Sequence, residues 1–336
     1  MKEYQNLFMD NESPIFIDKY LSCKTLERLK YITQFCGADY TNLYNPLFLY
    51  TRYDHSITVA HMTWHFTHDK KSTIAALLHD VGTPCFAHTI DYVFGDYINQ
   101  ESSEKDIVEM IKKDEYLMKC LKEDEIDLDM LRDLTQYPIL ENKSPKLCTD
   151  RLDGVLHTCY IWLHTHPLED IKKVYEDITV LTNEDGLSEI GFKHKREAMK
   201  FAKMVTVYAK ELWGNRDKYV SKYISELVKL SVERKLITLE DLYVKKETEI
   251  TDIFDKNFST WKEFEQVSIL IGTEKKPVGF SISFAAKKRN TIPLVQVGKS
   301  SKRIVDASSI VNKIYSNLEE YHDYKYAYLE TIKDIF

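Results

Sequence analysis

Residues 75–82 of the chain have the sequence AALLHDVG, in which a histidine and an aspartate, His79 and Asp80, directly follow an apolar run. The run is short and is typical of the buried end of a helix. Burying an imidazole and a carboxylate beside alanine and leucine side chains is unfavourable unless a partner pairs with them. A divalent cation would be such a partner, and this stretch therefore predicts a metal site at the end of a helix.

Two other stretches contain residues that would complete the set of ligands. Residues 52–56, RYDHS, contain His55, and residues 149–153, TDRLD, contain Asp150. The cation would then have two nitrogen and two oxygen ligands, a mixture that suits Fe, Mn, Ni or Zn better than Mg. Four protein ligands leave coordination positions open for water and a substrate, as a catalytic site requires.

The composition is that of an ordinary globular protein and excludes several classes of function. The 336 residues are 43% hydrophobic and 29% charged, and the formal net charge of -7 argues against a general nucleic-acid binder. The sequence has no G-x-G, which excludes a dinucleotide loop and a P-loop, and no G-x-S-x-G nucleophile elbow. The six cysteines form no C-x-x-C pair, the first residues are polar, and no apolar run approaches the ~18 residues of a membrane span. We therefore expect a cytoplasmic protein with free thiols and no membrane contact.

The first two-thirds of the chain has the periodicity of helices, whereas the last third contains strands. Apolar residues at helical spacing predict helices at about 26–35, 104–121, 146–164, 195–213 and 217–235. A polar loop that ends in glycine predicts a hairpin at 178–192. β-branched residues predict strands at 267–271, 278–284 and 292–297, and a helix follows at about 307–321. We expect a mainly α fold, with a helical domain over 1–248 and a C-terminal α+β subdomain over 249–336.

Five stretches together resemble the HD-domain phosphohydrolase superfamily, and within it the deoxynucleotide triphosphohydrolase branch related to the vertebrate SAM-and-HD-domain protein. Residues 27–34, ERLKYITQ, resemble R-L-x-x-I-x-Q of that branch, and residues 52–56 resemble R-F-x-H-S. Residues 79–91, HDVGTPCFAHTID, resemble H-D-x-G-H-G-P-F-S-H-x-x-D. Residues 150–153 resemble D-K-x-D, and residues 192–195, FKHK, resemble Y-x-H-K. The likeness runs from about residue 19 to 245 and implies an HD-domain helical bundle.

The resemblance implies a role for ten residues. The metal ligands would be His55, His79, Asp80 and Asp150. His88, supported by Asp91, would donate or accept a proton near the scissile phosphate. The substrate contacts would be Arg52 and Arg151 at phosphate oxygens, Gln34 near the sugar, and Phe192 where the family has a tyrosine. The resemblance also implies a homodimer or a larger homo-oligomer.

Four positions depart from the pattern of the branch. Thr83 replaces the third histidine of the family, and Gln100 replaces a histidine on the next helix. Beyond Asp150, Gly154 replaces a tyrosine and Thr158 replaces an aspartate. The first two changes remove imidazoles that would stabilise or protonate the phosphate chain, and the last two remove contacts expected at the sugar hydroxyl. All four predicted metal ligands are therefore present, whereas several residues that would contact the substrate are replaced.

Other histidines and one further aspartate have less specific interpretations. His61, His65 and His68 have no acidic residue on their helix face, so we interpret them as structural or surface residues, and we treat His157 in the same way. Asp153 lies three residues after the last predicted ligand. It either hydrogen-bonds to a metal ligand or forms an ion pair on the surface of its helix.

Three hypotheses of function follow. The first is a metal-dependent phosphohydrolase that acts on a nucleotide or another small phosphate ester, with dNTP triphosphohydrolysis as the leading specific activity. The second is a regulatory protein that binds metal and nucleotide without turnover, a reading motivated by Thr83 and Gln100. The third is an HD phosphodiesterase or nuclease acting on cyclic nucleotides or nucleic acid, although the negative charge makes a polymer the less attractive substrate.

Overall fold

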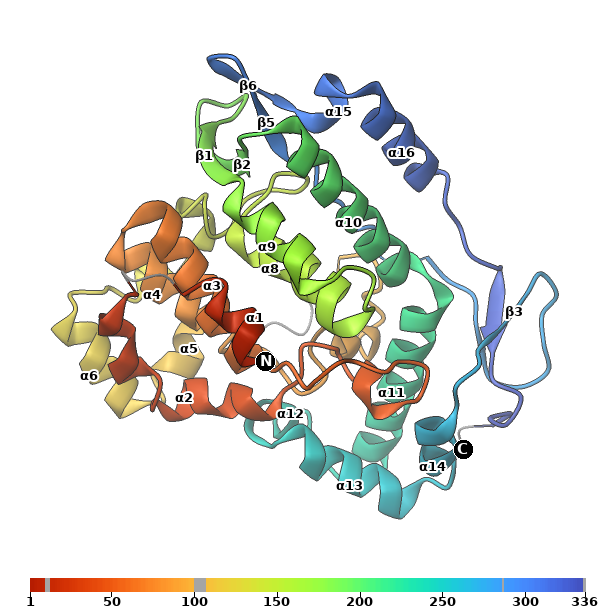
Figure 1. The fold of residues 1–336 in the computed structure, drawn as a ribbon. Helices are drawn as coiled ribbons and strands as arrows, with labels where there is room; N and C mark the ends of the chain where they lie inside the picture. Colours follow the sequence, from red (N-terminus) through yellow and green to blue (C-terminus); the bar gives the residue numbers. More distant parts are fainter. Residues whose placement is uncertain (10–12, 100–106, 286, 335–336) are drawn as a thin grey trace.

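Helices make up most of the computed structural model, which describes residues 1–9, 13–99, 107–285 and 287–334 (Figure 1). Together with two small β-sheets, they confirm the predicted mainly α fold class. The helical elements before residue 165 are α1 (Lys2–Asn6), η1 (Ile15–Tyr20), α2 (Lys24–Glu27), η2 (Arg28–Tyr31), η3 (Ala38–Tyr40), α3 (Arg52–Thr67), α4 (Lys70–Leu78), η4 (Ala87–Tyr92), α5 (Ile107–Ile111), α6 (Glu115–Glu123), α7 (Asp129–Arg132), η5 (Leu134–Gln136), α8 (Thr149–His157) and the π-helical η6 (Thr158–Trp162). Those after it are α9 (Leu168–Glu176), α10 (Lys195–Trp213), α11 (Asn215–Glu233), α12 (Asp241–Val244), α13 (Glu247–Asn257), α14 (Thr260–Gln266), α15 (Ile304–Ala307) and α16 (Ser309–Glu319).

Side-chain caps explain where several of these helices begin. The hydroxyl of Thr51 accepts the backbone N–H of Asp54, whose carboxylate accepts the N–H of Thr51 in return, and this capping box starts α3. Asp69 caps α4 by accepting the N–H of Ser72 at 2.8 Å. Asp114 caps α6 in the same manner, so the helix predicted over 104–121 is divided into α5 and α6 where the structure describes it. Residues 104–106 of that prediction lie outside the described part.

The other predicted helices agree with the structure to different degrees. The two long helices α10 and α11 match the predicted ranges within two residues, and the helix predicted over 146–164 begins at Thr149 and becomes π-helical at Thr158. The helix α16 lies beside α10 (Figure 1). At 26–35, four residues at spacing three are fully buried, but the backbone there forms only the short α2 and η2. The apolar spacing therefore identified the buried face correctly and overestimated the length of the helix.

The strands form two separate sheets. They are β1 (Ile178–Thr182), β2 (Ser188–Phe192), β3 (Ile271–Thr273), β4 (Ser281–Ile282), β5 (Leu294–Val297), β6 (Ser300–Arg303) and β7 (Tyr326–Tyr328). The sheet with the order β1-β2-β5-β6 contains the predicted hairpin, in which Val180 pairs with Ile190, and β2 pairs with β5 in parallel. The second sheet has the order β3-β7-β4. The predicted boundary at 248/249 falls within α13, and the β2–β5 pairing joins residues from the two sides of it.

Two large hydrophobic clusters fill most of the interior, and α3 contributes to both. Val59 and Ala60 belong to the smaller cluster with the apolar residues of α4, whereas Met62 belongs to the larger one. His55 lies on the same helix and is only 1% exposed. A buried polar side chain between two apolar clusters must find its partners on neighbouring elements. The fold therefore directs the polar groups of α3 toward α4 and α8.

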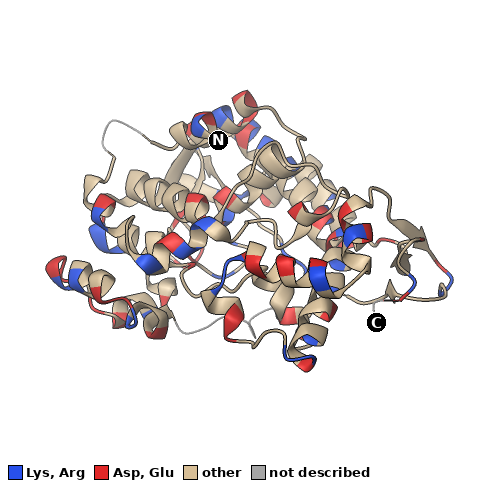
Figure 2. Ribbon diagram, turned by 90° about the horizontal axis from the view of Figure 1, so that it is seen from below, with Lys and Arg blue, Asp and Glu red and all other residues tan. Residues whose placement is uncertain are grey.

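The surface mixes charges of both signs. Figure 2 shows basic and acidic residues interspersed along the same helices, and several of them pair one turn apart, as Lys173 and Glu169 do at 3.2 Å. All six cysteines are free, as predicted, and Cys36 alone among them is not fully buried. Within the described ranges, no helix combines the length and the hydropathy needed to cross a lipid bilayer.

Candidate metal centre

Three helices bring together the four predicted metal ligands. His55 lies in the first turn of α3, and His79 and Asp80 directly follow the last residue of α4. Asp150 is the second residue of α8. Each side chain is therefore placed by a helix terminus, where the backbone position is well determined by caps and by the buried apolar run.

The ligand atoms are spaced as the first coordination shell of a cation requires. Nε2 of His55 is 3.0 Å from Oδ1 of Asp150 and 3.9 Å from Oδ2 of Asp80. Nε2 of His79 is 3.5 Å from the same Asp150 oxygen and 3.7 Å from the same Asp80 oxygen. Ligands about 2.1 Å from one cation are separated by ~3.0 Å at a right angle and by ~3.4 Å at the tetrahedral angle. The ligand atoms of His55, His79 and Asp80 all lie within 4.8 Å of one another, and Asp150 faces both imidazoles.

Both imidazoles present Nε2 to this centre because their other nitrogen is occupied. Nδ1 of His55 lies 2.6 Å from Oδ2 of Asp153, and Nδ1 of His79 lies 2.7 Å from the carbonyl of Ala76. Nε2 of His79 is buried and has no hydrogen-bond partner among the described residues. A buried nitrogen in this state is a natural metal ligand, so the residues fit a divalent cation.

Charges around the centre keep its carboxylates ionised. Nη1 of Arg52 lies 2.8 Å from both oxygens of Asp80, and the hydroxyl of Thr83 donates to Oδ1 of Asp80 at 3.1 Å. Burial opposes ionisation, but Arg52 and then His79 outweigh it and hold the pKa of Asp80 below its usual range. Burial likewise opposes protonation of His55, but hydrogen bonds to Asp150 and Asp153 raise the pKa of His55 to about 10. A cation that binds here therefore displaces a proton.

The predicted proton-transfer pair also lies together. His88 and Asp91 are both on η4, with Nδ1 of His88 3.3 Å from Oδ2 of Asp91. Asp91 is fully buried, whereas about a third of the His88 side chain, 34%, is exposed. Burial and the positive charge of Arg289 lower the pKa of His88 to about 4. His88 is therefore neutral near pH 7, when it can accept a proton.

The four predicted substrate contacts are placed differently from one another. Oε1 of Gln34 is buried without a hydrogen-bond partner among the described residues, which leaves it able to accept from a ligand. Arg52 is paired with Asp80, as described above. The guanidinium of Arg151 donates to the carbonyl of Lys146, to Glu141 and to Asn142, so it fixes the loop before α8.

Phe192 does not join this group of residues. It is fully buried on β2, where its ring packs 5.3 Å from that of Phe201, in the hydrophobic core. Two of the departures from the family pattern can also be placed. Gly154 and Thr158 follow Asp150 on the same helical run. Apart from its chain neighbours and the backbone of its own helix, no described atom lies within 4 Å of the position that a Cβ of Gly154 would take. Gln100 lies outside the described residues.

Sequence reasoning missed several groups around the centre. Arg28 donates through Nη2 to the carbonyl of Thr83, while its buried Nε and Nη1 have no hydrogen-bond partner among the described residues. Arg28 was part of the ERLKYITQ motif, so the signal was present but had no role assigned to it. Arg289 belongs to a segment tied down at Lys287, which donates to Tyr97, and at Ile292, which donates to Pro145. It lies outside the resemblance, in the basic run 287–289, which by its sequence could bind a nucleotide phosphate but was interpreted as a solvated surface.

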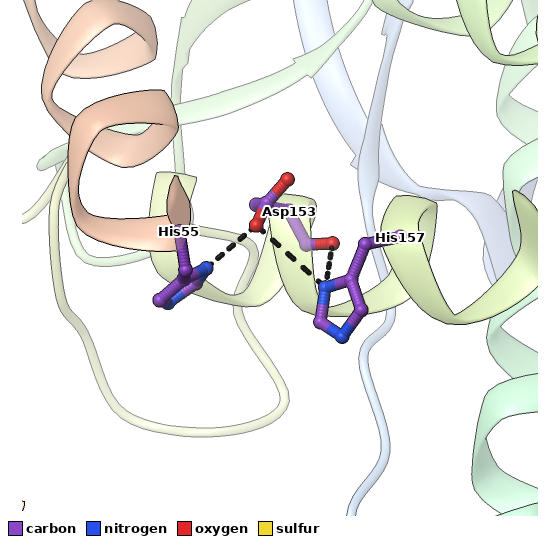
Figure 3. Close-up of side chains that lie close together, drawn as sticks. All are labelled: His55, Asp153 and His157. Atoms are coloured by element: carbon purple, nitrogen blue, oxygen red, sulfur yellow. Dashed lines mark hydrogen bonds and ion pairs between the residues drawn. The ribbon is translucent and has the colours of Figure 1, made fainter. Parts of the chain in front are cut away.

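A second cluster of possible metal ligands adjoins the first. His55, Asp153 and His157 have ligand atoms that all lie within 4.8 Å of one another, and all three residues are buried (Figure 3). Glu141, Cys148 and Asp150 form a third such group. Both groups share a residue with the first centre, so they are extensions of it and not remote sites.

The comparisons with known proteins agree with this geometry. Residues 52–142 match the family model of the HD domain, and Asp150 lies just beyond the match. The chain therefore contains an HD domain, a domain typical of metal-dependent hydrolases. The HD domain implies a divalent metal, which the His/Asp clusters described above could bind.

Individual relatives resemble larger parts of the chain. The uncharacterized protein YdhJ of Bacillus subtilis is 27% identical over 249 residues, which cover 70% of this chain and 70% of that protein. The uncharacterized protein MG461 of Mycoplasma genitalium is 26% identical over 212 residues, which cover 55% of this chain and 48% of that protein. The crystal structure of a hypothetical protein from Aquifex aeolicus is 14% identical, with a TM-score of 0.49 and a coverage of 92% of this chain and 90% of that chain.

Proposed function

We propose that this protein is a metal-dependent phosphohydrolase that acts on a nucleotide phosphate ester, with hydrolysis of a dNTP to a deoxynucleoside and triphosphate as its leading specific activity. The observation that carries the proposal is the arrangement of His55, His79, Asp80 and Asp150. These residues come from three separate stretches, and the distances between their facing nitrogen and oxygen atoms are only 3.0 to 3.9 Å.

The residues around the centre provide the remaining chemistry. A divalent cation, when bound, would polarise a phosphoryl oxygen and lower the pKa of a bound water. If Asp91 accepts the Nδ1–H of His88, then Nε2 of His88 is the atom that accepts a proton from the attacking water or returns it to the leaving group. The unpaired Oε1 of Gln34 would accept a hydrogen bond from a sugar hydroxyl.

The test is a screen of nucleotides with Mn²⁺, Fe²⁺, Ni²⁺, Zn²⁺ and Mg²⁺, with the products separated by chromatography. Release of triphosphate from a dNTP supports the specific activity. Release of monophosphate, or cleavage of a cyclic nucleotide alone, keeps the metal-dependent hydrolase and replaces the substrate. If no phosphate ester is cleaved with any of these metals, the proposal of hydrolysis is wrong.

One observation favours a second candidate, a protein that binds metal and nucleotide without turnover. The two arginines that the family would use on phosphate, Arg52 and Arg151, are each held by a protein carboxylate, that of Asp80 or Glu141. A nucleotide that raises the melting temperature of the metal-loaded protein without forming any product would favour this candidate.

A further inference from the structure

The short N-terminal helix α1 reaches the side of the metal centre that faces away from the cation. Tyr4 of this helix is fully buried, and its hydroxyl donates to Oδ1 of Asp153 at 2.6 Å. The neighbouring Gln5 donates to Oδ1 of Asp54, a residue of the capping box that begins α3. The helix is therefore connected at two points to the elements that hold His55.

The carboxylate of Asp153 receives three hydrogen-bond donors. Besides Tyr4, the hydroxyl of Tyr50 lies 3.0 Å from Oδ2, and Nδ1 of His55 lies 2.6 Å from the same oxygen (Figure 3). The Tyr50 hydroxyl is also 3.0 Å from the hydroxyl of Thr58. Since an ionised carboxylate can only accept, the Tyr50 hydroxyl donates its hydrogen bond to Asp153 and accepts one from the hydroxyl of Thr58. All five groups of this network are buried.

This network holds His55 in one tautomer. A carboxylate at Nδ1 keeps a proton there, so Nε2, which faces Asp150, is the nitrogen that would give up its proton to a cation. Nδ1 of His157 is bound to the backbone carbonyl of Asp153 at 2.8 Å and lies 3.6 Å from its carboxylate. The cluster of His55, Asp153 and His157 is therefore a support for the first centre, and its ligand atoms are already engaged by protein groups.

We propose that Tyr4 and Tyr50 are positioning residues of the metal centre: their hydroxyls fix the carboxylate of Asp153, which fixes the imidazole of His55 for the cation. The proposal rests on the metal centre of the proposed function. It makes the N-terminal helix a part of that centre, although Tyr4 and Asp153 are 149 residues apart. Burial and the charge of Asp153 raise the pKa of Tyr4 well above its usual value, so its hydroxyl remains a donor at all ordinary pH values.

Tyrosine-to-phenylalanine variants test the role of the hydroxyls with little change in packing. The Tyr4 ring makes edge contacts with Phe8 at 5.0 Å and Tyr50 at 5.7 Å, and a phenyl ring keeps both. The matched control is Tyr44→Phe, since the buried Tyr44 hydroxyl donates to Glu211 at the same 2.6 Å but contacts none of the four metal ligands. The readout is the affinity for Mn²⁺ by titration calorimetry of the full chain.

We expect Tyr4→Phe and Tyr50→Phe each to weaken Mn²⁺ binding by about 3- to 10-fold, and Asp153→Asn by about 10- to 100-fold, as is usual when a residue behind a ligand is changed. The control should bind Mn²⁺ like the wild type, even where it lowers the melting temperature as much as Tyr4→Phe does. Equal Mn²⁺ affinity in Tyr4→Phe, Tyr50→Phe and the control would overturn the positioning role and leave the proposed function intact.

The two proposals fail in distinguishable ways. Weakened Mn²⁺ binding in both variants, in a protein that cleaves no phosphate ester, supports the positioning role and overturns the proposed hydrolysis. A wild-type protein that binds no Mn²⁺ overturns the metal centre and the positioning role together.

Discussion

Glu247 should make the fold less stable as the pH rises from about 5 to about 8. Its carboxylate is fully buried and accepts the backbone N–H groups of Thr33 at 3.1 Å and Phe86 at 2.7 Å. These bonds favour the ionised form, but burial and then the charge of Asp39 outweigh them and raise the pKa of Glu247 to about 8. The carboxyl group thus binds protons more tightly in the folded protein than in the unfolded chain. Its contribution to stability is fully present below the usual pKa of 4.5 and is lost as the pH rises through about 8.

The size of the effect follows from the change in pKa. A rise from 4.5 to about 8 corresponds to at most about 5 kcal/mol at roughly 1.4 kcal/mol per unit. Burial also raises the pKa of Asp39, to about 6. Asp39 titrates in the same environment and therefore accounts for part of this pH dependence. Between about pH 5 and pH 8, we therefore expect the free energy of unfolding of Glu247→Gln to fall by about 2–3 kcal/mol less than that of the wild type.

The assay is urea unfolding of the metal-free protein followed by circular dichroism, with the free energy of unfolding extrapolated to water at several pH values. Glu263→Gln, which changes an exposed carboxylate on α14, is the matched control and should keep the slope of the wild type. A wild-type stability that is flat or increases over this range would refute the reasoning. So would a Glu247→Gln variant with the same slope as the wild type.

Three further perturbations have defined outcomes. Arg289→Met should raise the pKa of His88 from about 4 toward the usual 6.5, because it removes a nearby positive charge, and an NMR titration of the His88 ring measures this. Arg52→Met should lower the free energy of unfolding of the metal-free protein by about 3 kcal/mol, because it leaves the buried carboxylate of Asp80 without its ion pair, and urea unfolding measures this. Asp150→Asn should abolish retention of the metal, because it removes a negatively charged metal ligand whose oxygen faces both imidazoles. Elemental analysis of the purified protein measures this.

Each of these outcomes has a contrary result. An unchanged His88 titration in the Arg289 variant would show that the charge of Arg289 does not lower the pKa of His88. An Arg52 variant as stable as the wild type would mean that Asp80 is solvated. Metal retention in Asp150→Asn equal to that of Asp129→Asn, a control on an exposed side chain of α7, would remove Asp150 from the set of ligands.

Much of the local structure could be predicted because its causes are local. An apolar run such as the one before His79 acts within a few residues, so the buried end of α4 was readable from the sequence. The hairpin formed by β1 and β2 was predicted for the same reason. Predicted lengths were less accurate where a helix changes character, as it does at Thr158, because backbone geometry there depends on what packs around it.

The sequence by itself determined which side chains are candidates for binding a metal, since a histidine and aspartate next to an apolar run must be paired, and it predicted Asp80 and Asp150 in one centre before any distance was known. Only the tertiary structure decided which partner each group takes. Arg151 is bound to the loop before α8, Phe192 lies in the core, and Tyr4 of the N-terminal helix contacts Asp153, which is 149 residues away in the sequence. The physical reason is that residue type and helix position are properties of a short segment. The nearest acceptor for a buried guanidinium or hydroxyl is instead set by packing between segments far apart in the sequence.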